Sequence, residues 1–163
     1  MIRPLVAAEI AALAARLADL PLMQRYQRTA EALGRDLAAA LARGDGLLVH
    51  DGAPAPTDGA PGPADGPDGL VWFLSHGTLG MGGYLRLLAV APGGEGRGTG
   101  AALLAAFEEA VARWSGHAFL LVSDFNAGAQ RFYARHGYTQ VGRLPGLVLP
   151  DVDEVLYWRR LPR

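Results

Sequence analysis

The sequence predicts a mixed α/β fold, and three observations lead to that prediction. The chain has 163 residues, which is enough for one domain with a single buried core. Half of the residues are apolar and 19% are charged, as in an ordinary globular protein. Finally, strand-like runs alternate with helical periodicity in the middle of the chain and pair as hairpins at its ends.

The first half of the chain has clear helix and strand signals. We expect, in order, a strand at 1–6, helices at 7–21 and 29–43, and strands at 46–52 and 69–77. Pro4 favours an edge position for the first strand. Pro21 is expected to end the first helix, and Gly44 to stop the second.

Residues 51–69 contain only Asp, Gly, Ala, Pro and one Thr. Such a composition buries too little apolar surface to offset the entropy of ordering. We therefore expect a mobile surface loop that joins two strands, with the alternative that it covers a substrate.

The second half gives the strongest element predictions. We expect a strand at 82–92, a helix at 98–114, a strand at 117–125, a helix at 126–137, and a final strand pair at 138–144 and 154–161. In the helix at 98–114, Leu103, Leu104, Phe107 and Val111 share one face. These residues predict a buried helix that directly follows a strand and a glycine-rich loop.

Composition excludes several functions. The formal net charge is −1 and no basic run stands out, so nucleic acid is not an expected partner. The chain has no cysteine and no metal-ligand spacing of histidines, so neither a thiol nucleophile nor a metal site is expected. All basic residues are arginine, which excludes a Walker A lysine and a Schiff base. With no apolar run of membrane-spanning length and no signal pattern, we expect a cytoplasmic protein without a membrane partner.

The stretch "GGEGRGTG", residues 93–100, indicates a phosphate site. The first turn of a helix has unpaired N–H groups that carry partial positive charge, and glycines before it let an anion approach the backbone. A dinucleotide is one candidate ligand, because residues 96–101 fit G-x-G-x-x-G/A and Asp124 follows the next strand. Residues 91–95 separate the strand end from that motif, however, where the dinucleotide fingerprint requires a tight turn.

Two motifs together resemble the GNAT superfamily of acyl-CoA-dependent N-acetyltransferases. The diphosphate loop of that family reads Gln/Arg-x-x-Gly-x-Gly/Ala after a strand ending in Val-x-Pro. "VAPGGEGRGTG" matches this pattern, except that Glu95 occupies the Gln/Arg position. The second motif, in "NAGAQRFYARHGY", is carried by Asn126, Ala129, Phe132, Tyr133, Gly137 and Tyr138.

The resemblance implies a mostly antiparallel twisted sheet flanked by helices and splayed between its two central strands. It also implies an enzyme that moves an acetyl group from acetyl-CoA, as co-substrate, directly to a primary amine. The residues it places at acetyl-CoA are Leu88, Ala89 and Val90 along the pantetheine arm, Gly96, Arg97, Gly98, Thr99, Gly100 and Ala101 at the diphosphate, and Asn126 at a pantetheine amide.

The resemblance further implies that Tyr133 lies near the thioester sulfur, where a phenol can give the departing thiolate a proton or a hydrogen bond. Tyr26, Trp72, Phe73 and His76 are candidates for binding the acceptor, an amine-bearing small molecule or peptide. The base stays open between a water chain, His76, Asp124 and Asp153. The sheet edges of this architecture also allow a homodimer.

Two other functions stay open at this point. Because Glu95 replaces the usual Gln/Arg and the strand at 82–90 has no carboxylate, the domain could bind acyl-CoA as a non-catalytic sensor or interaction module. The formal dinucleotide motif leaves an NAD-binding oxidoreductase as a more remote alternative.

Overall fold

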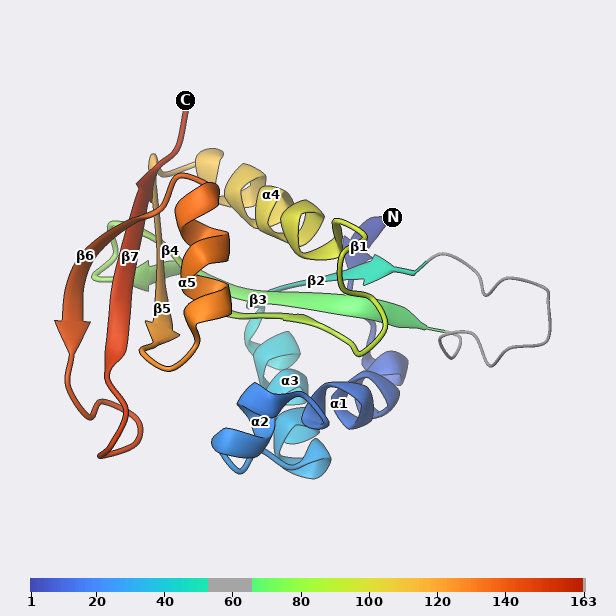
Figure 1. Ribbon diagram of the computed structural model, residues 1–163. Helices are drawn as coiled ribbons and strands as arrows, with labels where there is room; N and C mark the ends of the chain where they lie inside the picture. Colours follow the sequence, from blue (N-terminus) through green and yellow to red (C-terminus); the bar gives the residue numbers. More distant parts are fainter. Residues whose placement is uncertain (53–65, 163) are drawn as a thin grey trace. The chain divides into compact units, whose positions relative to one another are not determined.

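The computed structural model describes residues 1–52 and 66–162 (Figure 1). The strands are β1 (Ile2–Pro4), β2 (Gly46–Asp51), β3 (Pro67–Thr78), β4 (Gly82–Val90), β5 (His117–Ser123), β6 (Thr139–Leu144) and β7 (Glu154–Arg160). The helices are the 3₁₀ turn η1 (Ala7–Glu9), α1 (Ile10–Ala18), α2 (Pro21–Arg25), α3 (Ala30–Arg43), α4 (Thr99–Ala112) and α5 (Ala127–Arg135).

The strands form one seven-stranded sheet in the order β1-β2-β3-β4-β5-β7-β6. β4 and β5 are parallel, whereas the pairs β1–β2, β5–β7 and β6–β7 are antiparallel. A parallel pair needs a crossover between its strands, and α4 provides it here. The prediction of a mixed, mostly antiparallel sheet flanked by helices is therefore confirmed.

The chain divides into two compact units. Unit 1 comprises residues 1–72 and 87–107, and unit 2 comprises residues 73–86 and 108–163. The prediction of a single domain over the whole chain stays a prediction.

The core of unit 1 lies where α1 and α3 pack together beside β2 and β3 (Figure 1). Its fully buried residues include Leu13, Leu17, Leu37, Val49 and Leu70. The helical spacing of the leucines in α1 and α3 makes one apolar face on each helix, and burying those faces stabilises both.

The predicted boundaries of α3 are confirmed in detail. The Thr29 side chain accepts a hydrogen bond from the N–H of Ala32 at 3.1 Å, as an N-cap does. At the other end Gly44 has φ +80°, the left-handed conformation that a helix C-cap favours.

The prediction that Pro21 ends the first helix is wrong. α1 already ends at Ala18, and Pro21 is the first residue of α2. Proline has no N–H to donate and its φ suits a helix, so it is well placed in a first turn, where the backbone N–H groups have no partner within the helix. Most of the predicted loop at 51–69 lies outside the described residues, and β3 begins at Pro67 rather than at residue 69.

Unit 2 contains the ladder of β4, β5, β7 and β6, together with α5 and the end of α4. The parallel ladder joins Gly83, Tyr84 and Leu85 to residues 118–120, and residues 86–90 and 121–123 continue the two strands past it. Glu108 of α4 and Arg159 of β7 form an ion pair with N–O distances of 2.8 and 2.9 Å, which ties the helix to the sheet.

Candidate active site

The glycine-rich loop connects β4 to α4 and comprises residues 91–98. Gly93, Gly96 and Gly98 have φ of +86°, +74° and +82°, a region that side-chain-bearing residues rarely adopt. A Cβ atom on any of the three would meet no heavy atom within 4 Å, so the space beside them is open. An exposed loop of this conformation at the N-terminus of a long helix is suited to binding an anionic ligand through backbone N–H groups.

Glu95, the residue that departs from the family pattern, folds back on its own loop. Its carboxylate accepts a hydrogen bond from the N–H of Gly93 at 2.8 Å, and the residue is exposed. The carboxylate is therefore held at the beginning of the loop and in contact with solvent. Arg97, two residues on, is also exposed and carries the opposite charge.

The other predicted acetyl-CoA residues lie on or next to the elements that the sequence predicted, and their binding role stays a prediction. Leu88, Ala89 and Val90 are the last residues of β4, and Thr99, Gly100 and Ala101 form the first turn of α4. Asn126 precedes α5, and its side-chain oxygen accepts the N–H of Ala129 at 3.1 Å. Asn126 therefore has a helix-capping role, which the comparison of motifs did not predict.

Tyr133 lies on α5 and is 6% exposed. Its ring makes edge-to-face contacts with Phe132 and with Tyr138, at centroid distances of 5.2 and 5.7 Å. Burial raises the pKa of the Tyr133 phenol, and the nearby hydroxyl of Tyr84 raises it further. The phenol therefore stays protonated at neutral pH and is available as a proton donor.

The candidate acceptor residues differ in burial. Trp72 and Phe73 are each 5% exposed, and the Trp72 indole N–H donates to Asp45 at 2.9 Å. Burial and this hydrogen bond favour a packing role for Trp72. Tyr26 follows α2 and is half-buried, and His76 is exposed with its ring 4.0 Å from that of Trp114. An acceptor-binding role for these four residues stays a prediction.

Two of the candidate bases form ion pairs. Asp153 accepts a hydrogen bond from Arg143 at 2.9 Å, and Asp124 lies 3.8 Å from the same guanidinium.

The structure also shows a buried carboxylate that the sequence analysis did not identify. Glu154, the first residue of β7, is 5% exposed and accepts a hydrogen bond from the Ser123 hydroxyl at 3.4 Å. A strand that begins with an acid usually exposes it, so sequence pattern alone gave no signal for this burial.

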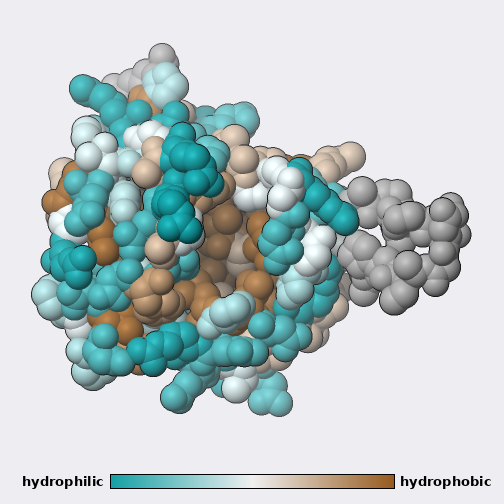
Figure 2. All heavy atoms as spheres, viewed as in Figure 1, coloured by the Kyte–Doolittle hydropathy of each residue, from teal (hydrophilic) through white to brown (hydrophobic). Residues whose placement is uncertain are grey.

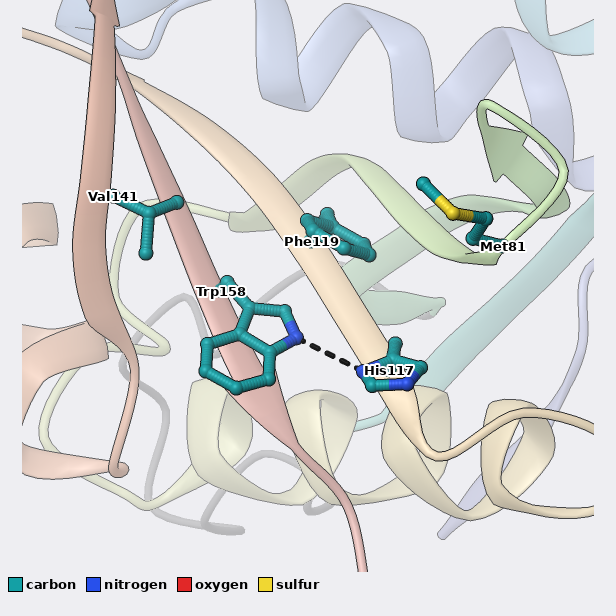
Figure 3. A pocket seen from close by; sticks show the side chains of 5 residues that line it. All are labelled: Met81, His117, Phe119, Val141 and Trp158. Carbon is teal, nitrogen blue, oxygen red and sulfur yellow. Dashed lines mark hydrogen bonds between the residues drawn. The ribbon is translucent and has the colours of Figure 1, made fainter.

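Unit 2 also has an apolar pocket of about 600 Å³ on its sheet (Figure 3). It is lined by Met81, His117, Phe119, Val141 and Trp158. The Trp158 indole N–H donates to Nδ1 of His117 at 3.1 Å, which fixes one wall (Figure 3). None of the predicted site residues lines this pocket. Its five side chains come from four separate parts of the chain, and because only the sheet brings them together, sequence pattern carried no signal for the pocket.

Apolar side chains of β6 and of the loop after it are also exposed in unit 2. Val141 and Leu144 of β6, and Leu147 and Val148 of the following loop, are each more than a third exposed. Figure 2 shows apolar surface among the polar side chains on the side where β6 and β7 lie.

Comparison with known proteins finds one family whose model matches part of the chain. Residues 65–140 match the family model of the acetyltransferase (GNAT) domain, a range that contains β3, the glycine-rich loop, α4, β5 and α5. Residues 65–140 therefore resemble the GNAT acetyltransferase domain, as the two sequence motifs predicted. No curated protein sequence gives a significant match.

Solved structures show the same fold over nearly the whole chain. Ard1 from Thermoplasma volcanium has a TM-score of 0.76 at 21% identity and covers 100% of this chain and 98% of its own. An aminoglycoside 6'-N-acetyltransferase complexed with coenzyme A has a TM-score of 0.72 at 16% identity, with 100% and 98% covered. A ribosomal-protein-alanine N-acetyltransferase from Brucella melitensis has a TM-score of 0.66 at 19% identity, with 99% of both chains covered. Among the described residues, no helix has both the length and the apolar character needed to cross a membrane.

Proposed function

We propose that the protein is an acetyl-CoA-dependent N-acetyltransferase that moves an acetyl group directly to a primary amine. The observation that carries the proposal is the glycine-rich loop at the start of α4, with its left-handed glycines, inside the segment that matches the GNAT model. The coenzyme A bound to the aminoglycoside acetyltransferase of the same fold supports the choice of ligand.

The loop residues fit a diphosphate. Gly96 and Gly98 leave open space where side chains would stand, and the N–H groups of the first turn of α4 have no partner within the helix. Arg97 adds a positive charge that can reach a phosphate oxygen. Leu88, Ala89 and Val90 would pair with the pantetheine amides, and the side-chain N–H groups of Asn126 would contact one of them.

Acetyl-CoA supplies the acetyl group as a thioester: the amine nitrogen bonds to the carbonyl carbon, the carbon–sulfur bond breaks, and the thiolate leaves. The role of Tyr133 is to donate its phenolic proton to that sulfur. The phenol is protonated at neutral pH, so it is able to give the developing thiolate a proton or a hydrogen bond. No acyl-enzyme is involved, and the amine loses its own proton to water or to a nearby base.

The proposal is tested by mixing the purified protein with acetyl-CoA and a panel of amines that contains polyamines, aminoglycosides and short peptides. We expect release of free CoA thiol with at least one amine class, and a 42 Da mass increase of that amine. CoA binding without thiol release from any member would favour the non-catalytic sensor. Binding of NADH without binding of CoA would favour the oxidoreductase.

Glu95 is expected to weaken CoA binding through its charge. We predict that Glu95→Gln lowers the Kd for CoA by about threefold to fivefold, because removing a like charge from a solvent-exposed site beside the diphosphate relieves a repulsion of about 0.6–1 kcal/mol. The gain should shrink in 0.5 M salt, where screening is stronger. Isothermal titration calorimetry measures both values.

The matched control is Glu109→Gln, which removes an exposed acid from the other end of α4, where Glu109 pairs with Arg113. We expect it to leave the Kd for CoA within twofold of the wild type. An equal gain in both variants would mean that only net charge matters, and no gain in Glu95→Gln would mean that its carboxylate does not act on the ligand.

A further inference from the structure

Asp68, near the start of β3, carries a buried carboxylate with two partners. The residue is 4% exposed. Nδ1–H of His50 donates to one carboxylate oxygen at 2.6 Å, and the hydroxyl of Thr99 lies 3.5 Å from the other oxygen. His50 comes from β2 and Thr99 is the first residue of α4, so this carboxylate joins three elements of unit 1.

The backbone of the same residue holds the other end of the glycine-rich loop. The carbonyl oxygen of Asp68 accepts the N–H of Ala91 at 2.8 Å. Ala91 directly follows β4, whereas Thr99 begins α4. One residue therefore binds the loop where it begins, through its backbone, and where it ends, through its side chain.

The neighbouring glycines keep the loop close to this anchor. A Cβ on Gly69 would stand 2.9 Å from Cγ2 of Thr99 and 2.8 Å from Cδ1 of Leu103, so the first turn of α4 packs directly on the backbone of β3. A Cβ on the buried Gly94 would lie 3.4 Å from the Asp68 carbonyl oxygen. Both contacts leave the loop little room to move relative to β3.

We propose that Asp68 is a positioning residue for CoA: its carboxylate, oriented by His50, fixes Thr99 and so holds the N–H groups of the first turn of α4 in the geometry that binds the diphosphate. The inference rests on the proposed function. Asp68 does not touch the ligand, and its removal acts through the loop. The expected signature is a loss of CoA affinity with little change in turnover once the enzyme is saturated.

The test compares Asp68→Ala, Thr99→Val and Thr99→Ser with the wild type. We expect the Kd for CoA and the KM for acetyl-CoA to rise about tenfold in Asp68→Ala, the size of effect typical of losing a hydrogen bond to a buried charged group, with kcat within twofold. Thr99→Val keeps the shape of the side chain but loses the hydroxyl, so it should also raise the Kd for CoA and the KM for acetyl-CoA. Thr99→Ser keeps the hydroxyl and should restore values near those of the wild type.

Asp45→Asn is the matched control. Its carboxylate is also largely buried and accepts the Trp72 indole N–H, but Asp45 precedes β2 at the end opposite His50. We expect it to lower the melting temperature and leave the Kd for CoA unchanged. Circular dichroism and thermal melts establish whether each variant is folded. If Asp68→Ala does not fold, the comparison of Thr99→Val with Thr99→Ser decides the test.

Unchanged CoA affinity in folded Asp68→Ala and in Thr99→Val would overturn the inference, as would a fall in kcat without a change in Kd. If the wild type and these variants bind CoA equally well, only the role of Asp68 is contradicted. A wild-type protein that binds no CoA contradicts the proposed function, and the role of Asp68 with it.

Discussion

Replacing Tyr133 with phenylalanine is expected to lower kcat at least about tenfold while leaving the Kd for CoA within twofold, because general acids typically contribute a factor of about 10² or more. The substitution removes only the hydroxyl, so the edge-to-face contacts of the ring with Phe132 and Tyr138 are kept. Steady-state kinetics with a reactive amine from the panel measures kcat, and calorimetry measures CoA affinity.

Tyr138→Phe is the matched control for this experiment. Its hydroxyl is buried beside the carboxylate of Glu108 and makes no hydrogen bond of normal geometry, so losing it should have little effect on activity. Equal turnover in Tyr133→Phe and in the wild type would remove Tyr133 from the mechanism. Equal losses in both variants would indicate that the aromatic cluster, rather than the Tyr133 hydroxyl, sets the rate.

The same assignment predicts the pH dependence of the wild type. Burial raises the pKa of Tyr133 above its ordinary value of about 10, so the protonated donor persists through the whole range below that value. We therefore expect kcat/KM to rise with pH as the acceptor amine loses its proton, and kcat to show no decline before pH 10. A decline between pH 8 and 9 would mean that a group other than Tyr133 supplies the proton.

Gly83→Ala is expected to destabilise the fold strongly. A Cβ at this position of β4 would lie 2.2 Å from Cγ2 of Val111 in α4, a distance that real side chains essentially never show. Because Val111 is fully buried and cannot move aside freely, either the helix or the strand must shift. We expect a loss of about 2–3 kcal/mol in the free energy of unfolding, as in other overpacked cores, measured by urea denaturation.

Gly34→Ala provides the opposite result in the same experiment. Gly34 lies inside α3, and a Cβ there would meet Ala14 and Ile10 at ordinary distances of 3.8 and 3.9 Å. Alanine is a better helix former than glycine, so we expect a gain of about 0.5–1 kcal/mol. If Gly83→Ala were as stable as the wild type, the packing of α4 against β4 described here would be wrong.

Local signals in the sequence predicted most of the fold. The helix at 29–43 and its stop at Gly44 are both determined within one segment of chain, and both were confirmed. The glycine-rich loop was predictable for the same reason, since a strand, five glycines and an apolar helix follow one another directly. The prediction for Pro21 was wrong because a proline is compatible either with the end of one helix or with the first turn of the next. Only the surrounding chain decides between the two.

Features that depend on tertiary contacts were not predictable. Asp68 looked like part of a loop of Asp, Gly, Ala and Pro, yet its carboxylate is buried between His50 and Thr99, each distant in sequence. Glu154 is buried only because β7 pairs with β5 and so brings it to Ser123. The apolar pocket around Trp158 likewise forms from side chains that the sheet register brings together.

The most direct test of the central claim is a thermal shift of the wild-type protein with CoA, acetyl-CoA and NADH measured in parallel. A ligand at 100 times its Kd stabilises the folded state by about 2.7 kcal/mol, which raises the melting temperature of a domain of this size by several degrees. We expect such a rise with CoA and with acetyl-CoA and none with NADH. No rise with either CoA ligand, or a rise with NADH alone, would contradict it.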